Sequence, residues 1–326
     1  MQAEWAASAD EYLLPGQTLV VGLSGGMDSV ALLHWLSHNG ETDHFRLAAL
    51  HVHHGLSHNA DQWAAHCETL CAALDIPLSI EMAKVERHSR DGLEGAARRA
   101  RHSAFSRADG DWIVLAHHRG DQAETLLFNL LRGCGVRGAG AMRRRQGRLL
   151  RPWLALGRDD IEKYALETNL RWVEDESNAD VRYNRNFLRH QVVPKLSERF
   201  PAADERLRAA ADQFADAQEL LDELALMDLA GVPPVFPVPM RAFAYLSDKR
   251  AANLLAYLLR ESGVSVTSRN RLVEAVRQFL TAAADRHPSV RFGEYHLRRR
   301  RGMIELVLQT DPRAIIIDNN ESGGNP

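Results

Sequence analysis

The chain has 326 residues, 45% of them hydrophobic, and a formal net charge of −3. This length allows a buried core, most simply divided between two domains, and the charge balance excludes a chain that binds nucleic acid by bulk charge alone. Three cysteines are too few for a disulfide scaffold, and acidic residues among positions 1–14 exclude a signal peptide. No apolar run reaches the length of a membrane span. We therefore expect a cytoplasmic protein.

Residues 18–36 form the most informative stretch of the sequence. Residues 18–23 are almost entirely apolar and predict a buried strand, and a glycine-containing polar turn follows them. Glycine lets the backbone N–H groups of such a turn face one point, and the positive end of the next helix adds to this anion site. We therefore expect the turn to bind phosphate or pyrophosphate through Ser24, Gly25, Gly26, Met27, Asp28 and Ser29.

This turn differs from the two common nucleotide-binding loops. No lysine follows its glycines, as a Walker loop requires, and its spacing is not Gly-x-Gly-x-x-Gly. An ordinary strand-to-helix turn of the same composition is the plain alternative.

Apolar and amphipathic stretches then alternate along the chain. Strands are predicted at 45–52, 77–83 and 112–116, and helices at 62–74, 93–108 and 121–131. This alternation predicts an α/β fold with a parallel, doubly wound sheet, which binds ligands at the carboxyl ends of its strands. The turn at 24–29 and the pairs His53-His54 and His117-His118 follow such strands, so we expect three polar turns to share one crevice.

Asp121 and Glu124 are the candidate acids of this crevice. They stand three residues apart at a helix start, which places both carboxylates on one face. Such a pair can hold Mg²⁺ or bind an ammonium group; a capping box of Asp121 with Glu124, without any function, is the alternative. We expect His54 and His117 to contact nucleotide. No metal site is predicted, because the histidines lack a further ligand at zinc spacing.

The second half of the chain has a different character. A helix is predicted at 158–168, then a hydrogen-bonding stretch at 175–186 that is either a surface loop or a binding loop. Helices follow at 202–229, 248–261 and 268–284, and a hairpin spans 289–308 with its turn near Arg301-Gly302. We therefore expect a first domain at 1–200, a smaller, mostly helical domain at 201–310, and a disordered tail at 311–326.

Several of these motifs together resemble the tRNA(Ile)-lysidine synthetase family of the N-type ATP-pyrophosphatase (PP-loop) superfamily. They are residues 24–29, 51–56, 117–125, 130–133 and 151–152, and the signature Asp175-x-Ser-Asn-x-Asp-x-x-Tyr-x-Arg-Asn-x-x-Arg189. The resemblance implies a fold like that of the adenine nucleotide alpha hydrolases. Two departures stand out: Gly120 replaces a usual aspartate, and the chain resembles the short form of the family, without an additional C-terminal domain.

The resemblance also implies a two-step ligation on tRNA(Ile) with a CAU anticodon. ATP, with Mg²⁺, adenylates C2 of the wobble cytidine; the amine of free L-lysine then displaces AMP and forms lysidine. Asp28, Asp121 and Glu124 become the candidate catalytic residues. Between Leu130 and Leu154 lie seven arginines and no acid, which favours a polyanion over a merely solvated face. The candidate tRNA ligands are Arg132, Arg137, Arg143, Arg144, Arg145, Arg185, Asn186 and Arg189.

Two other functions fit parts of the same sequence. A PP-loop tRNA thiolase would share the ATP loop, but the chain has no Cys-x-x-Cys, and Cys67 and Cys71 lie four apart among apolar residues, as buried structural thiols do. A nucleotide-binding module without catalysis is favoured only by Gly120. The assembly state stays open, with a homodimer as the alternative to a monomer.

Overall fold

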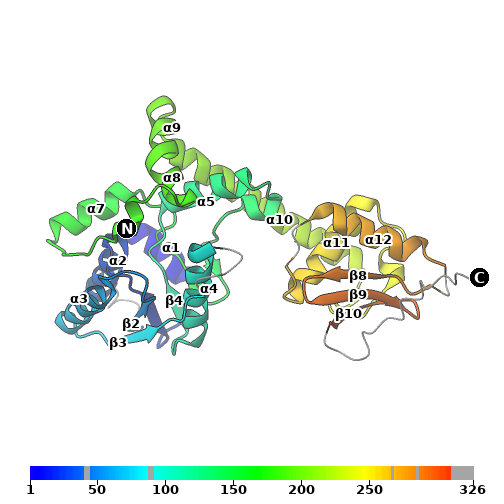
Figure 1. Ribbon diagram of the computed structural model, residues 1–326, viewed down its shortest axis with the longest axis horizontal. Coiled ribbons are helices and arrows are strands. Elements are labelled where there is room, and N and C mark those ends of the chain that lie inside the picture. Colours follow the sequence, from blue (N-terminus) through cyan, green and yellow to red (C-terminus); the bar gives the residue numbers. More distant parts are fainter. Residues whose placement is uncertain (40–44, 87–91, 266–267, 284–285, 310–326) are drawn as a thin grey trace, which may run out of the picture. The chain divides into compact units, whose positions relative to one another are not determined.

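The computed structural model describes residues 1–39, 45–86, 92–265, 268–283 and 286–309 (Figure 1). The chain divides into two compact units, residues 1–215 and residues 216–326, with the division inside helix α10 (Ala203–Leu229). The tail expected at 311–326 lies outside the described residues. Within the described ranges, no helix is both long and apolar enough to cross a membrane.

Unit 1 is built on a six-stranded sheet with strand order β3-β2-β1-β4-β6-β5. Its strands are β1 (Thr18–Gly22), β2 (Arg46–His53), β3 (Leu78–Met82), β4 (Trp112–Val114), β5 (Arg145–Gln146) and β6 (Leu149–Leu150). All neighbours are parallel except β5 and β6, so the predicted α/β class is confirmed. Strand order reverses at β1, which lies between β2 and β4. The carboxyl end of β1 is therefore the switch point at which open sheets of this kind bind ligands.

Helices cover both faces of this sheet. They are α1 (Gln2–Tyr12), α2 (Met27–Asn39), α3 (Ala60–Ala73), α4 (Gly92–Arg107), α5 (Arg119–Leu131), α6 (Val136–Ala139) and α7 (Arg158–Glu167). Helix α1 was not predicted, yet it carries the fully buried Trp5, whose ring meets the edges of Trp35 and Phe45. Those contacts anchor α1 to the main core, which the sequence of α1 alone does not indicate because its apolar residues follow no strong helical stripe.

A helical stretch without a break follows the polar segment after α7. The stretch comprises α8 (Asn184–Phe187), η3 (Leu188–Val192) and α9 (Val193–Arg199), with η3 a single turn of π-helix, and the short 3-10 helix η2 (Glu176–Ala179) precedes it, separated by residues 180–183. Helix α10 then packs on α5 and α6 through Leu126, Ala139 and Ala211. The π-turn is relevant to the site because such turns often mark functional positions, and this one carries Arg189.

Unit 2 combines the second half of α10 and two further helices with a second sheet (Figure 1). The helices are α11 (Asp248–Glu261) and α12 (Arg269–Thr281), and the antiparallel strands, in sheet order, are β7 (Val238–Pro239), β10 (Met303–Leu308), β9 (Tyr295–Arg300) and β8 (Ser289–Phe292). The turn at Arg301-Gly302 is confirmed, with φ of 49° and 74°. The range 289–308 forms strands as expected, but a second turn at Gly293 divides it into three strands rather than two. Strand β7 was not predicted, because two residues carry too little alternation to be recognised.

Candidate active site

Hydrogen bonds between its own residues fix the conformation of the turn after β1. Gly25 has φ +88°, and a Cβ there would lie 2.9 Å from Val173 Cγ2, so both its dihedral and its neighbour require glycine. Ser29 Oγ accepts the Ser24 N–H at 3.2 Å and donates to the Gly26 carbonyl at 2.9 Å. The first N–H groups of α2 begin at Met27 and have no partner within the helix. These features are those of an anion cradle.

Asp28 stands in the first turn of α2, beside this cradle. Its Oδ1 atom is buried without a hydrogen-bond partner among the described residues, and its Oδ2 atom lies 3.9 Å from Nε2 of His118. Burial raises the pKa of Asp28, which nearby His118 partly offsets. A buried carboxylate oxygen without a partner is a costly feature, so this atom fits a role in binding a cation.

His118 is the N-cap residue of helix α5 and was not expected to be a site residue from the sequence. Its Nδ1 atom accepts the Gly120 N–H at 3.1 Å, and Asp121 accepts the His118 N–H at 3.0 Å, so these residues form the capping box. The helix was expected to start at Asp121, which was wrong, since α5 begins at Arg119; the alternative of a capping box between Asp121 and Glu124 is not formed either, because the box joins His118 and Asp121. Because Nδ1 accepts, a neutral ring carries its proton on Nε2, 3.5 Å from Asp121.

Gly120 makes room for this histidine. A Cβ at position 120 would lie 2.9 Å from Cε1 and 3.1 Å from Nδ1 of His118. The departure from the usual aspartate is therefore coupled to the position of a buried ring that faces Asp28 and Asp121. Glycine here is compatible with an intact set of acids.

Asp121 and Glu124 do share one face, and two arginines meet them there. Arg189 donates to Glu124 at 2.6 and 2.9 Å and to Asp121 at 2.9 Å. Arg185 lies 3.5 Å from Glu124 and donates to the Thr125 hydroxyl at 2.8 Å. Burial opposes ionisation of Asp121, but the nearby histidines and arginines outweigh it and lower its pKa to about 2. Asp121 is therefore ionised, and both acids are already paired with guanidinium groups.

One histidine of each pair, His54 and His117, supplies a neutral ring at this edge of the sheet. Burial lowers the pKa of His54 to about 4 and that of His117 to about 3, and the Nδ1 atom of each lacks a partner among the described residues. His51 donates to the Leu23 carbonyl at 2.8 Å, and His53 lies 3.0 Å from Asp61. No group of three His, Cys, Asp or Glu side chains within the described ranges could hold a metal ion.

The segment 173–189, here called the strap, contacts the turns that follow β1 and β2 and the helix α5 that follows β4. The Val173 N–H donates to the Gly25 carbonyl at 2.9 Å, Glu176 accepts from Ser57, and Arg189 binds Glu124. Asn186 stabilises the strap, because its side-chain amide donates to the backbone carbonyls of Ser177 and Asp180. The strap contains the signature stretch, which therefore contacts the turn after β2 and the acids of helix α5.

In the basic stretch, Arg144 is half-buried and Arg145 is exposed, and both contact neighbouring elements. Arg144 binds Glu4 at 2.8 Å, and Arg145 stacks over Tyr12 and Trp112. These two side chains hold α1 and the sheet edge in place. The remaining arginines of the stretch that were expected to bind tRNA are exposed: Arg132, Arg137 and Arg143.

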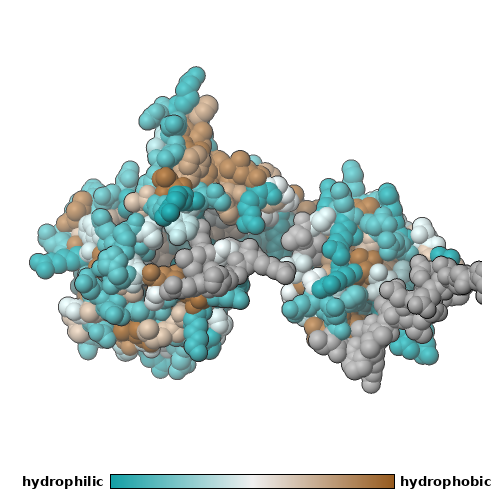
Figure 2. All heavy atoms as spheres, in the orientation of Figure 1, coloured by the Kyte–Doolittle hydropathy of each residue, from teal (hydrophilic) through white to brown (hydrophobic). Residues whose placement is uncertain are grey.

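Apolar side chains are also exposed over α5, α9 and α10 (Figure 2). Phe187, Phe200 and Leu131 are exposed by 44%, 51% and 76%. Arg132 stacks on Phe128, and Arg199 stacks on Phe200. Aromatic faces beside arginines are the kind of surface that binds unstacked nucleotides.

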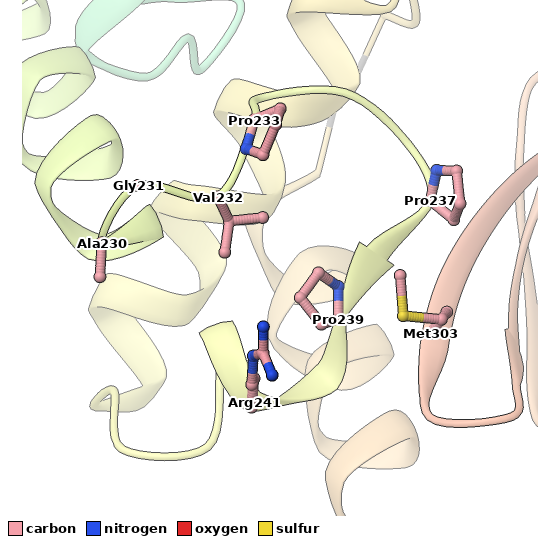
Figure 3. Close-up of a pocket in the computed structure, with 8 residues that line it drawn as sticks. All are labelled: Ala230, Gly231, Val232, Pro233, Pro237, Pro239, Arg241 and Met303. Atoms are coloured by element: carbon pink, nitrogen blue, oxygen red, sulfur yellow. The ribbon is translucent and has the colours of Figure 1, made fainter.

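Unit 2 contains an open pocket of about 510 Å³ (Figure 3). Prolines line it together with Met303, and Arg241 is its one charged residue. Arg241, Arg300 and Arg301 are exposed, and none shows an ion-pair or side-chain hydrogen-bond partner among the described residues. The pocket has neither an acid nor a glycine cradle, so it does not resemble the site in unit 1.

Comparisons with known proteins agree with this division. A family profile described as the PP-loop domain matches residues 2–196, and the TilS substrate binding domain matches residues 239–304. The tRNA(Ile)-lysidine synthase of Aromatoleum aromaticum is 48% identical over 81% of this chain and 63% of its own length. That of Xanthomonas axonopodis pv. citri is 42% identical over 90% of this chain and 68% of its own length.

The fold also has a solved counterpart. The U34-tRNA thiolase NcsA from Methanococcus maripaludis covers 66% of this chain and 77% of its own, with a TM-score of 0.53 and 14% identity, a likeness of fold alone. The chain spans about two thirds of the length of the curated relatives it matches, and slightly less for the first two. With matches over most of both units, the chain belongs to the PP-loop family and, within it, to the tRNA(Ile)-lysidine synthases.

Proposed function

We propose that the protein joins free L-lysine to C2 of the wobble cytidine of tRNA(Ile) bearing a CAU anticodon. ATP would first adenylate the C2 oxygen and release pyrophosphate, and the lysine ε-amine would then attack C2 and release AMP. The observation that carries this proposal is the row of carboxylates from Asp28 to Glu124, linked through His118, at the switch point of the sheet. It sets a phosphate cradle beside an acidic, amine-binding face.

The cradle at residues 24–29 suits the pyrophosphate end of the reaction. Its backbone N–H groups and the start of α2 stabilise the negative charge that develops on the leaving group. Asp28, with its unpartnered Oδ1 atom, would hold Mg²⁺. When bound, Mg²⁺ supplies positive charge against the pyrophosphate oxygens. The free Nδ1 atoms of His54 and His117 would hydrogen-bond to the nucleotide.

The acid pair suits the amine. Lysine has a pKa near 10.4 in water, so the protein must first recognise the ammonium and then remove a proton before the amine can attack. Asp121 and Glu124 are carboxylates on one face that already hold a guanidinium group, which is what cation recognition requires. We assign the recognition to both and the role of proton acceptor to one of them.

The arginines and aromatic rings of the surface suit RNA. The target base must leave its stack to be reached, and Phe187, Phe200 and Arg132 offer stacking faces and positive charge. In unit 2, Arg241, Arg300 and Arg301 are unpaired cations within or beside the matched substrate binding domain. We assign phosphate contacts to these residues as well.

Thiolation is the rival reaction on the same fold. It requires a reactive sulfur near the nucleotide, but burial raises the pKa of Cys67 to about 12 and that of Cys71 to about 11. Thiols with such pKa values are not nucleophilic near neutral pH. The structure offers no second cysteine beside Cys134 among the described residues.

The deciding assay is incorporation of labelled lysine into an unmodified tRNA(Ile) transcript with a CAU anticodon, in the presence of ATP and Mg²⁺. A tRNA(Met) transcript, which has the same anticodon triplet, is the control. Incorporation into tRNA(Ile) alone supports the proposal. Release of AMP that depends on RNA but not on lysine, without incorporation, would mean that another nucleophile is used. The absence of both would favour the non-catalytic module.

A further inference from the structure

We propose that Arg189 occupies the amine-binding face of Asp121 and Glu124 in the free protein, and that an RNA phosphate must draw this arginine away before the amine substrate binds. The inference rests on the proposed function. It turns Arg189 from a simple RNA ligand into a residue that determines the order of binding.

The geometry is that of an occupied cation site. Arg189 makes three hydrogen bonds of 2.6 to 2.9 Å to the two carboxylates, including a two-pronged contact with Glu124. Glu124 is only 4% exposed, so few of its acceptor positions remain open to another cation. Paired, charge-assisted contacts of this kind are the strongest hydrogen bonds that proteins form.

The balance of charge also excludes a further cation. Asp121 and Glu124 carry two negative charges, and Arg185 and Arg189 carry two positive ones within hydrogen-bond or ion-pair distance. Asp28 also acts electrostatically on Arg189, but the proposed function assigns its charge to Mg²⁺. An ammonium group that joined all four would leave an uncompensated positive charge in a largely buried place. The amine can therefore bind well only when one guanidinium leaves, and Arg185 has a second anchor on Thr125.

Arg189 is placed to be drawn outward. Its side chain is 37% exposed, unlike the carboxylates it binds, and it stands on the π-turn between α8 and α9. The exposed aromatic residues Phe187 and Phe200 lie at the two ends of the same helical stretch. An RNA that stacks there would bring phosphates near the exposed guanidinium, and a phosphate is an equally good two-pronged partner for arginine.

The test measures binding of labelled L-lysine by equilibrium dialysis, with and without the unmodified tRNA(Ile) transcript. For the wild-type protein, RNA should raise the affinity for lysine at least about tenfold, which is the scale of one charge-assisted hydrogen bond. Lysine should raise the affinity for RNA by the same factor, because the coupling is reciprocal. Equal lysine affinity with and without RNA, or no lysine binding at all, would overturn the proposal.

Variants separate this exchange from a merely structural tether. Arg189→Gln should bind lysine without RNA at least about tenfold more tightly than the wild type, since the acids lose their internal cation. Arg189→Lys, which keeps the charge but not the fork, should lie between the two. Arg182→Gln is the matched control, because Arg182 lies in the same strap, is 88% exposed and pairs with Asp180 instead.

A tether would behave in the opposite way. If Arg189 only held the strap in place, Arg189→Gln would bind lysine no better, or less well, than the wild type and Arg182→Gln. Incorporation of lysine into the transcript by the wild type is measured in parallel. If it succeeds while lysine affinity ignores Arg189, the exchange is wrong and the proposed function holds; if incorporation fails, the function is wrong whatever the binding data show.

Discussion

His118 touches Gly120 with one ring nitrogen and faces Asp121 with the other, at 3.1 Å and 3.5 Å. One buried ring therefore caps helix α5 and orients a proton toward the carboxylates. These two roles can be separated by substitution, because an N-cap needs only an acceptor atom close to the backbone.

Replacing His118 should distinguish the cap from the proton. His118→Ala should lower the free energy of unfolding by about 1 to 2 kcal/mol, the usual loss for an N-cap, and also lower kcat. His118→Asn should restore much of the stability, since asparagine is a favoured N-cap, without restoring kcat. Urea unfolding and single-turnover assays measure the two effects. Full activity of the asparagine variant would show that the ring contributes only the cap.

Glu124 should matter to lysine transfer more than to adenylation. Glu124→Gln keeps the shape of the side chain but removes the charge that the amine requires. We expect RNA-dependent adenylate formation to continue and lysine transfer to fall at least about a hundredfold, given that a buried charge partner is worth roughly 3 kcal/mol or more. Quenched-flow analysis of the adenylated RNA separates the steps. Normal transfer by this variant would remove Glu124 from the mechanism.

Acid should destabilise unit 1 through His54 and His117. Both have a folded-state pKa, about 4 and about 3, below the value near 6.5 of an unfolded histidine. Their contribution is therefore complete above about pH 6.5 and is lost as the pH falls toward 4, because the unfolded chain takes up protons first. Each should add a slope of about 1.4 kcal/mol per pH unit in this window. Denaturant unfolding of His117→Asn should show a shallower slope than the wild type between pH 6.5 and 4.

Removal of charge at Arg132 should weaken RNA binding in a salt-dependent way. Arg132→Gln is expected to raise the KM for tRNA and to lower the slope of log affinity against log salt by about one, with ATP binding unchanged. Arg46→Gln is the matched control, since Arg46 is exposed at the amino end of β2, whereas the site lies at the carboxyl ends of the strands. Equal salt slopes for both variants would contradict a specific phosphate contact at Arg132.

The thiols should react unequally. Near pH 8, Cys134, which is half-buried, should react with a thiol reagent, whereas Cys67 and Cys71 should react only on unfolding because burial raises their pKa well above that pH. Mass spectrometry after a timed reaction identifies the modified positions. Rapid modification of Cys67, whose sulfur lies 3.5 Å from His51, would reopen the case for sulfur chemistry.

Much of the fold could be predicted because its signals are local. Strands β1, β2 and β4 each contain an apolar run, β3 alternates apolar and polar residues, and the helices between them show apolar residues at helical spacing, so the parallel sheet could be predicted. Helix α1 and the two-residue strands β5 and β6 gave no such signal. They exist because of partners distant in sequence, such as Trp35 for Trp5 and β4 for β6.

The same division holds for the site. The cradle and the pair Asp121 and Glu124 follow from glycine spacing and from their place after strands. The contact of Arg189 with Glu124 joins residues 65 apart, and the room that Gly120 leaves for His118 depends on a rotamer. Neither is encoded in a short pattern, which is why the arginine was expected on an open RNA surface.

The contacts of the strap determine how substitutions within it should affect function. It is fastened by Val173 to the phosphate turn, by Glu176 to the turn after β2 and by Arg189 to the acids. A substitution within the strap should therefore weaken the binding of nucleotide, amine and RNA together. A growth-based screen would record such a substitution as a general loss of function rather than as weaker binding of one ligand. By the same logic, a single reporter on this segment should sense every stage of the catalytic cycle.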